Sequence, residues 1–370
     1  MVRSCFALAT ALPLVLASGG MAQADWPERP INAIAGWSAG GSSDITTRAV
    51  VREMEGELGQ RITVTNITGA LGSIGAEAAL AAGPDGYTWF GGAAVAGTWP
   101  VLGHSDNSWD DFYSFLSVVF PTTIYVRDDA PWETIEDLVA ATEEAEPGTF
   151  RYGHPGAGSN GEIFAGLIME EAGLSGRVEP IPYEGGREAG RFLVAGEVDF
   201  ASVTMGDLTD WAVEGSIRPL VNLHDEEIEF EGVTFPSVVD YYPDLEPYSA
   251  INPYFGIYVH RETPEDIVIR IAEAFAHAVQ QESFISVAVD ERAGVLDPAI
   301  GQASDEIMSR VESARSWPLF ESDVAPNDPA EFGIPRVTEW SWPPHERAEQ
   351  ANPWPAEVED IFKSLQDELG

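Results

Sequence analysis

The sequence is poor in cysteine and in basic residues, and both shortages narrow what the protein can be. Its one cysteine is Cys5, so residues 25–370 contain none and cannot form a disulfide. Lys and Arg together number 19 against 61 Asp and Glu, which gives a formal charge of −42 at pH 7. Such a chain cannot neutralise a phosphate backbone, which excludes nucleic-acid binding. Without disulfides the fold must be stabilised by its core, and a hydrophobic content of 44% suffices for one or two domains.

The N-terminus has the pattern of an export signal. Arg3 precedes an apolar run from Ala7 to Ala17, and Ala22-Gln23-Ala24 precedes Asp25. We therefore predict a cleavable signal peptide over residues 1–24 and a mature protein in the periplasm. Cys5 lies before the apolar run, so it is not placed to carry a lipid anchor. No later apolar run approaches the roughly 20 residues that a membrane span needs.

The acidic excess is compatible with two interpretations. One is a solvated surface suited to high salt, where self-repulsion between like charges is screened. The other is multivalent cation binding, for which the acids at 106, 110 and 111 with Ser108 have nearly the spacing of a calcium loop. The glycine and the terminal glutamate of an EF-hand are missing there. We therefore predict no metal site and no cofactor.

Two segments of the chain follow the same order of strand, Gly/Ser turn, helix and strand. Hydrophobic periodicity predicts the first segment as a strand at Ile31–Ala35, a helix at Asp44–Leu58 and a strand at Ile62–Thr65. The second segment has the corresponding elements at Phe150–Gly153, Glu162–Ala172 and Val178–Tyr183. Each segment is a βαβ unit, so the sequence predicts an α/β fold.

The rest of the chain alternates between helices, strands and Pro-rich loops. Helices are predicted from an N-cap at Thr134 to Ala145, at Glu188–Ala195 and at Pro264–Val279, and strands at Val198–Val203 and Phe255–Val259. Beyond Trp317 the sequence is rich in Pro and Trp and ends in a helix carrying Val358, Ile361, Phe362 and Leu365. We expect the aromatic side chains of this last segment to pack on the body of the protein rather than to bind ligand.

Residues 36–40 form the G-x-S-x-G pattern of a serine-hydrolase nucleophile elbow, with Ser38 as the nucleophile. In α/β-hydrolases an earlier strand supplies the loop that gives the second oxyanion donor. Ser38 follows the first predicted strand of the mature chain, so no earlier strand is available. His260 and His277 are candidate bases, but neither lies in a recognisable partner motif. A hydrolase that uses Ser38 stays open as the alternative function.

A second interpretation uses both glycine turns. A helix N-terminus offers unpaired N–H groups and a partial positive charge, and glycine lets an anion approach the backbone closely. The first turn offers Gly40, Gly41, Ser42 and Ser43, and the second offers Gly158, Ser159, Asn160 and Gly161. Two such turns on separate lobes fit the two ends of a dicarboxylate. No Gly-Lys-Ser/Thr follows either turn, which argues against a phosphate loop, and two ordinary tight turns remain possible.

Four stretches of the sequence carry a resemblance to a known family. They are WPERPINAIAGWSAGGSSDITTRAV from Trp26, GALGSIGAEAALAAGPDGYT from Gly69, GAGSNGEIFAGLIMEEAG from Gly156 and IPYEGGREAGRFLVAGEVDF from Ile181. In this order they resemble the signatures of the Bug, or TctC-type, periplasmic solute receptors of tripartite tricarboxylate transporters. The resemblance runs with gaps from about Trp26 to Trp317.

The resemblance implies a two-lobed periplasmic-binding-protein fold, type II-like, in which each lobe is a mixed sheet flanked by helices and closes over the ligand. Lobe 1 is expected over residues 25–120 and 223–316, lobe 2 over 121–222, and a C-terminal extension over 317–370. The implied ligand is a small carboxylate, held mainly by backbone N–H groups, hydroxyls and water rather than by an arginine clamp. The implied binding residues are Trp37, Ser38, Ala39, Gly40, Gly41, Ser42, Ser43, Asp44, Gly158, Ser159, Asn160, Gly161, Tyr183 and Thr204.

Three positions depart from the family pattern as it stands in this sequence. Glu162 replaces a common histidine, Glu184 replaces a common lysine, and Trp37 replaces a common phenylalanine. Acids facing the ligand would disfavour a tricarboxylate, although both side chains are compatible with a solvated surface. Trp37 is compatible with stacking on an aromatic acid or with filling the lobe. The expected partners are a mono- or dicarboxylate and the integral membrane subunits of a tripartite transporter, and the receptor is expected to be a monomer.

Overall fold

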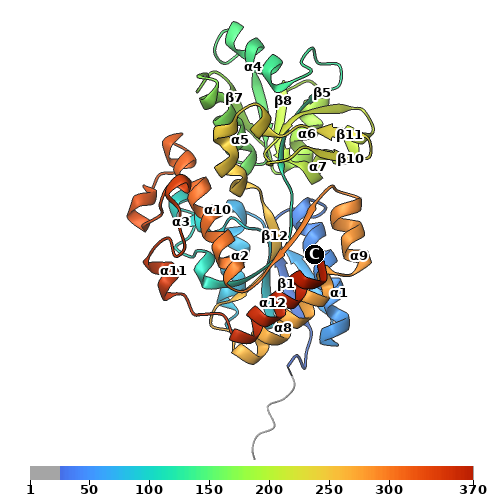
Figure 1. Ribbon diagram of the computed structural model, residues 1–370, viewed down its shortest axis with the longest axis vertical. Helices are drawn as coiled ribbons and strands as arrows, with labels where there is room; N and C mark the ends of the chain where they lie inside the picture. The colour runs from blue at the N-terminus through green and yellow to red at the C-terminus, as the bar shows by residue number, and fades with distance from the viewer. Residues whose placement is uncertain (1–25, 370) are drawn as a thin grey trace, which may run out of the picture.

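The computed structural model describes residues 26–369 as two bodies stacked along the long axis of the molecule (Figure 1). The predicted signal peptide over 1–24 and Cys5 lie outside the described residues. Each body is built on one mixed β-sheet, one with six strands and the other with five. No helix within residues 26–369 is both long and apolar enough to cross a membrane.

The first sheet has the strand order β13-β4-β12-β3-β1-β2. Its strands are β1 (Ile31–Ala35), β2 (Ile62–Asn66), β3 (Thr88–Ala93), β4 (Phe112–Val119), β12 (Tyr254–His260) and β13 (Val295–Ala299). β1 runs parallel to β2 and β3, whereas β12 is antiparallel to β3 and β4. Helices α1 (Ser42–Leu58) and α8 (Glu265–Val279) pack together against this sheet, and α2 (Ser73–Ala81) follows β2.

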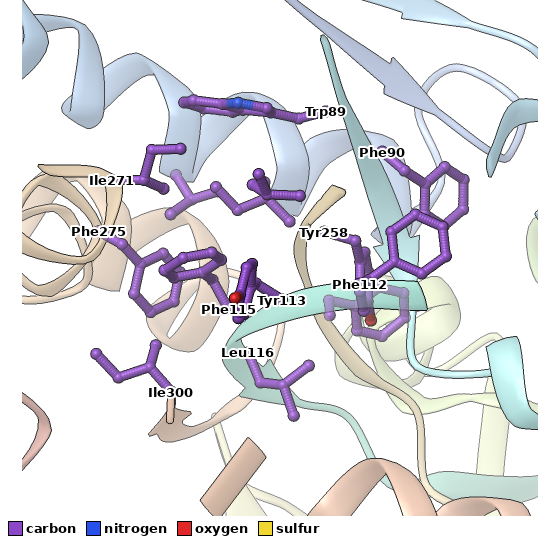
Figure 2. Close-up of a cluster of buried hydrophobic side chains, with 14 of the residues drawn as sticks. Trp89, Phe90, Phe112, Tyr113, Phe115, Leu116, Tyr258, Ile271, Phe275 and Ile300 are labelled. Atoms are coloured by element: carbon purple, nitrogen blue, oxygen red, sulfur yellow. The ribbon is translucent and has the colours of Figure 1, made fainter. Parts of the chain in front are cut away.

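The core of the first body is rich in aromatic side chains. Figure 2 shows Phe90, Phe112 and Tyr258 grouped on one side of the cluster and Phe115 with Phe275 on the other. The ring centroids of Phe90 and Tyr258 are 5.5 Å apart, and those of Phe115 and Phe275 are 5.6 Å apart. Large buried rings contribute much apolar area and a specific packing geometry, as a chain without disulfides requires.

The second sheet has the order β7-β6-β8-β5-β9. Its strands are β5 (Thr122–Arg127), β6 (Arg151–His154), β7 (Glu179–Pro182), β8 (Phe200–Thr204) and β9 (Ile217–Asn222). Side chains alternate along β5, so that Ile124 and Val126 join one hydrophobic cluster and Tyr125 joins the other. The connecting helices are α4 (Ile135–Glu144), α5 (Asn160–Glu171), α6 (Gly186–Val194) and α7 (Met205–Val213).

Two chain segments cross between the bodies beside each other. The first joins β4 to β5 through Phe120 and Pro121, and the second enters β12 through Asn252 and Pro253. The Phe120 N–H donates to the Pro253 carbonyl at 3.2 Å, and the Asn252 Oδ1 accepts from the Thr122 N–H at 2.8 Å. These bonds tie the two crossings into one narrow connection, which is the arrangement that a hinge needs.

Residues 223–251 pack on the second body, although the sequence led us to expect them in lobe 1. The hairpin of β10 (Ile228–Phe230) and β11 (Val233–Phe235) places Phe235 against Tyr125 of the second sheet, with ring centroids 6.3 Å apart. The following 3₁₀ helix, Pro243–Ile251, adds its buried Leu245 and Ile251 to the same body. Apolar contact with the second sheet therefore continues up to the return crossing.

The chain beyond β13 lies along the first body (Figure 1). Helix α10 (Gln302–Glu321) places Met308 in the first core and Leu319 in a cluster of the second. The segment after it forms α11 (Glu346–Gln350) and α12 (Ala356–Leu369), and α12 buries Val358 and Leu365 beside α8. The ring of Trp354 lies 5.4 Å from Phe115. The expectation that the aromatic residues of this extension pack on the body is confirmed.

The predicted helices and strands are present, with ends shifted by one or two residues. Helix α4 begins after Thr134, whose Oγ1 accepts the Asp137 N–H at 3.2 Å as an N-cap should. The sequence patterns did not predict strands β3, β4, β5, β9, β10, β11 and β13 or helices α2, α7, α10 and α11. Short helices α3 (Trp99–Leu102) and α9 (Glu282–Ile285) complete the described chain with several 3₁₀ turns.

Candidate functional site

A cavity of about 490 Å³ lies between the two sheets, where β1, β6 and β8 end. Both bodies contribute to its wall, and so do the return crossing and α10. The predicted residues that line it are Trp37, Ser38, Ala39, Gly40, Gly41, Ser42, Ser43, Ser159, Asn160 and Thr204. The two glycine turns therefore face one cavity. A volume of this size is typical of small-molecule sites, which run from about 300 to 1,000 Å³.

The first turn is fixed by Asp44. Gly40 has φ +84°, which favours glycine, and its N–H donates to Asp44 Oδ2 at 2.9 Å. The other oxygen of Asp44 accepts from Arg48 Nε at 2.9 Å and from Asn66 Nδ2 at 2.8 Å. Burial raises the pKa of Asp44, but the bonds from Arg48, Gly40 and Asn66 outweigh it and leave the pKa below its ordinary value. Asp44 is buried and does not line the cavity, so it shapes the turn that presents Ser38 and Ala39.

The second turn is closed by one of the chain's own carboxylates. The Gly158 N–H donates to Glu162 Oε2 at 2.6 Å, and Ser159 Oγ caps helix α5 by accepting the Glu162 N–H at 3.3 Å. Burial raises the pKa of Glu162. Neither Gly158 nor Glu162 lines the cavity. The N–H that the sequence offered to a ligand at Gly158 thus already has an anionic partner.

The remaining predicted residues divide between the wall of the cavity and its support. Asn160 Nδ2 donates to Thr122 Oγ1 at 2.7 Å and lies 3.4 Å from Thr204 Oγ1, which fixes the amide at the cavity wall. Gly161 does not line the cavity. It packs against the Ser202 carbonyl oxygen, from which a Cβ at position 161 would be only 1.9 Å away. Tyr183 stacks on Phe192 with ring centroids 4.6 Å apart and does not line the cavity.

Trp37 lines the cavity and also fills space inside the first body. Its ring lies 6.1 Å from that of Phe90, and a Cβ at Gly92 would be 2.1 Å from Trp37 Cζ3. Gly92, at φ +155°, is therefore required for the indole to fit. Trp37 therefore fills the lobe and also lines the cavity, and its stacking on an aromatic acid stays a prediction.

The hydrolase alternative finds no support in this geometry. No histidine is among the lining residues, so Ser38 has no imidazole beside it. His260 ends β12 and accepts the Glu262 N–H, and His277 lies 3.5 Å from Glu57 on the surface. Neither candidate base shares the cavity with Ser38.

Six charged residues line the cavity: Glu184, Arg187, Glu188, Arg191, Asp207 and Arg315. Four of them lie in the stretch from Ile181 to Phe200 that carried the resemblance, where Tyr183 was expected at the ligand and the orientation of Glu184 was left open. The other five were not predicted. Glu184 does face the cavity, unlike Glu162. Among residues 26–369 no cluster of three His, Asp or Glu side chains could hold a metal ion.

Asp207 connects the two bodies across the cavity. It lies in the first turn of α7, and its Oδ1 accepts from Ser42 Oγ at 2.7 Å and from the Ser42 N–H at 3.4 Å. Burial raises the pKa of Asp207, and the bonds from Ser42 oppose the rise. Nearby, Arg292 Nη1 donates to the Gly206 carbonyl at 3.1 Å, which adds a second link between the bodies. Contacts of this kind change when two lobes move relative to each other.

Known proteins match this chain over most of its length. The family model described as tripartite tricarboxylate transporter family receptor matches residues 46–317. A UPF0065 protein from the gbd 5' region of Cupriavidus necator is 30% identical over 297 residues, covering 76% of this chain and 84% of that protein. A TctC solute binding protein from Polaromonas is 26% identical, with a TM-score of 0.63 over 80% of this chain and 99% of that one.

Two solved structures from Rhodopseudomonas palustris contain ligands. One, with adipate, has a TM-score of 0.71 at 21% identity, and the other, MatC with bound malate, has a TM-score of 0.64 at 20% identity. Each covers 81% of this chain and 99% of its own. At these identities the likeness concerns the fold. The resemblance found in the sequence, and the two-lobed α/β architecture that it implied, are confirmed.

Proposed function

This chain belongs to the tripartite tricarboxylate transporter receptor family, and from that premise we propose that it captures a mono- or dicarboxylate in the periplasm and delivers it to the membrane subunits of a secondary transporter. Its family and fold are those of periplasmic solute-binding proteins, which catalyse no reaction. Export through the predicted signal peptide and a monomeric receptor are parts of the same proposal.

The observation that carries this proposal is the placement of both glycine turns on one cavity. Ser38–Ser43 come from the first body and Ser159 with Asn160 from the second, so a ligand between them contacts both. A ligand that binds both bodies stabilises the arrangement in which they are close, which is the linkage by which a two-lobed receptor signals occupancy. The connection at Phe120 and Asn252 would serve as the hinge.

The charges of the cavity favour a small acid of low charge. Its lining contains arginines and acidic side chains in equal number. A tricarboxylate would bring three negative charges close to Glu184, Glu188 and Asp207, which is unfavourable in a shielded site. The structural relatives with malate and adipate hold acids of the smaller class, which supports the same choice for this chain.

We also propose a division into lobes, which the packing of the described residues supports. We assign residues 26–120 and the chain from Pro253 through β13 to lobe 1, and residues 121–251 to lobe 2, with α10 and the C-terminal extension spanning both. Placing the hairpin and the 3₁₀ helix in lobe 2 extends it beyond the boundary at 222 expected from the sequence. The moving unit is then larger, and the hinge lies at the crossings themselves.

A thermal-shift screen of residues 25–370 tests the function. The panel contains malate, adipate, succinate, citrate and benzoate, each in moderate and in high salt. A ligand that binds only the native state raises its stability by RT ln(1 + [L]/Kd), so a dicarboxylate at 100 times its Kd should add about 2.7 kcal/mol. Stabilisation by malate or adipate with none by citrate supports the proposal. No stabilisation by any acid in either salt contradicts it.

A further inference from the structure

We propose that Arg315 is the cation that receives a carboxylate group of the ligand, so that this receptor adds an arginine to the backbone turns on which its family resemblance rests. The inference rests on the proposed carboxylate-binding function. It is carried by the position of Arg315 in the cavity wall, by its burial, and by the absence of an acidic partner among the described residues.

Arg315 lies inside the protein yet lines the cavity. It is 1% exposed and comes from the middle of α10, the helix that contacts both bodies. Its guanidinium donates to the Gly158 carbonyl at 2.8 Å and reaches the Ile251 carbonyl at 3.5 Å. Both acceptors are neutral backbone oxygens, so they orient the side chain without compensating its charge. Gly158 belongs to the second glycine turn, which places the cation beside that turn.

The one other buried arginine of residues 26–369, Arg261, has an acidic partner. Arg261, 5% exposed, forms a two-pronged ion pair with Asp305 at 2.9 and 2.7 Å. Arg347, which is partly buried, bonds Glu312 at 2.6 Å. Within residues 26–369 no carboxylate lies within ion-pair distance of Arg315. Arg315 is thus a buried cation that the described chain leaves uncompensated.

The acid nearest to Arg315 along its own helix is already engaged. Glu312 precedes Arg315 by three residues, a spacing that brings side chains together on a helix. Its two oxygens instead bind His345 Nε2 at 2.8 Å and Arg347 Nη2 at 2.6 Å, both from the C-terminal extension. The extension therefore neutralises Glu312 and leaves the charge of Arg315 for another anion.

An uncompensated guanidinium in the wall of a cavity is unfavourable unless an anion arrives there. Arg315 Nε has no hydrogen-bond acceptor within the described chain, so donor capacity is left over. Burial lowers the pKa of Arg315 to about 10, and the group stays protonated at pH 7. A carboxylate is planar and accepts two parallel N–H bonds, which matches the guanidinium geometry. The ligand class that fits is an acid with at least one ionised carboxylate.

A matched pair of variants separates charge from shape at this position. Arg315→Lys keeps the positive charge, and Arg315→Gln keeps a hydrogen-bond donor without the charge. Isothermal titration with malate and adipate is performed on the wild type and on both variants of residues 25–370. Loss of a charged hydrogen bond corresponds to about a 10- to 150-fold weaker Kd, so the Gln variant should bind at least about tenfold more weakly than the Lys variant.

The stability of the ligand-free proteins supplies an independent readout. If Arg315 serves the ligand, the Gln variant without ligand should melt no lower than the wild type, because it removes an unpaired buried charge. A purely structural arginine would lower the melting temperature and leave carboxylate affinity unchanged in any variant that folds. Equal affinity of the Lys and Gln variants, or of the Gln variant and the wild type, overturns the inference while the proposed function stands.

Failure of the proposed function has a different signature. If neither malate nor adipate binds the wild type, citrate, succinate and benzoate are titrated in the same way. If one of these acids binds the wild type, its Kd is measured for the Lys and Gln variants in place of the Kd of malate or adipate. If no acid binds the wild type, the carboxylate function is wrong and the assignment of Arg315 falls with it.

Discussion

Removing the buried charge of Glu312 should destabilise the protein strongly. The side chain is 0% exposed and is bound by His345 at 2.8 Å, by Arg347 at 2.6 Å and by Trp109 Nε1 at 3.1 Å. Glu312→Gln removes the nearer acidic partner of Arg347 and leaves it Asp110, whose Oδ1 lies 3.4 Å from Arg347 Nη1. Loss of one partner from a buried ion pair costs about 3–5 kcal/mol, and the remaining pair with Asp110 and the 29% exposure of Arg347 place this case at the lower end, about 3 kcal/mol. At about 2–4 °C for each kcal/mol, the melting temperature should fall by about 6–12 °C.

The same network predicts a pH dependence with a definite sign. Burial raises the pKa of Glu312, but His345 and Arg347 outweigh it and hold the pKa below its ordinary value of 4.5. An acid whose pKa is lowered in the folded state stabilises the fold above its unfolded pKa, and this stabilisation is lost as the pH falls through the folded pKa. The difference in stability between wild type and Glu312→Gln should be complete at pH 7 and should shrink below pH 4.5.

Calorimetric melts of the two proteins from pH 7 to pH 3.5 measure both effects. Glu321→Gln is the control on the same helix, because Glu321 pairs with Arg336 at 2.5 Å but is 48% exposed. A surface pair of this kind contributes about 0–1 kcal/mol. If Glu312→Gln melts within 1 °C of Glu321→Gln at pH 7, the buried network does not stabilise the fold and the prediction is wrong.

Three further predictions concern the turns and the cavity. Ser38→Ala should leave carboxylate affinity within about threefold, whereas Gly40→Val should abolish it in titration calorimetry, because valine strongly disfavours the φ of +84° that Gly40 has. Gly161→Ala should lower stability by about 1–3 kcal/mol in urea unfolding, since its Cβ would lie 1.9 Å from the Ser202 carbonyl oxygen; an unchanged midpoint would contradict this. Ligand-free Asp207→Asn should have a higher melting temperature than the wild type at pH 7. The pKa of the Asp207 carboxyl is raised in the folded protein, so its ionisation destabilises the fold as the pH rises. No rise in melting temperature at pH 7, or a rise that persists below pH 3.8, would count against this prediction.

Much of the architecture could be predicted because its signals are local. The periodicity of Ile31–Ala35 and of the helix ending at Leu58, with glycines between them, specifies a strand, a turn and a helix from neighbouring residues alone. The same holds for the unit that begins at Arg151. The positions that line the cavity in the first turn follow from the turn itself, since they are consecutive residues at the end of one strand.

The missed residues depend on contacts between distant parts of the chain. In the sequence Arg315 is a single charged residue close to Ser313 and Ser316, and nothing local indicates that it is buried. It is buried because α10 packs between the two bodies. Asp207 bonds Ser42, which is 165 residues away. Glu162 was expected on the surface or facing the ligand, yet it turns back onto the Gly158 N–H. No periodicity reports such pairings, because they are decided by tertiary structure.

The packing of residues 223–251 illustrates the same limit. A Pro- and Tyr-rich loop gives no periodic signal that would assign it to either sheet. Its position is decided by Phe235 meeting Tyr125 and by Leu245 entering the second core. Apolar side chains join whichever surface buries them, and that surface is known only once both sheets are formed.

The most direct measurement is a crystal structure of residues 25–370 with the carboxylate that most stabilises the protein. We expect the carboxylate to lie in the cavity between the turn at Ser38–Ser43 and the turn at Ser159–Asn160, with one carboxylate group on the guanidinium of Arg315. A ligand found outside this cavity, or held there by only one of the two bodies, would contradict the proposal that both turns together form the binding site.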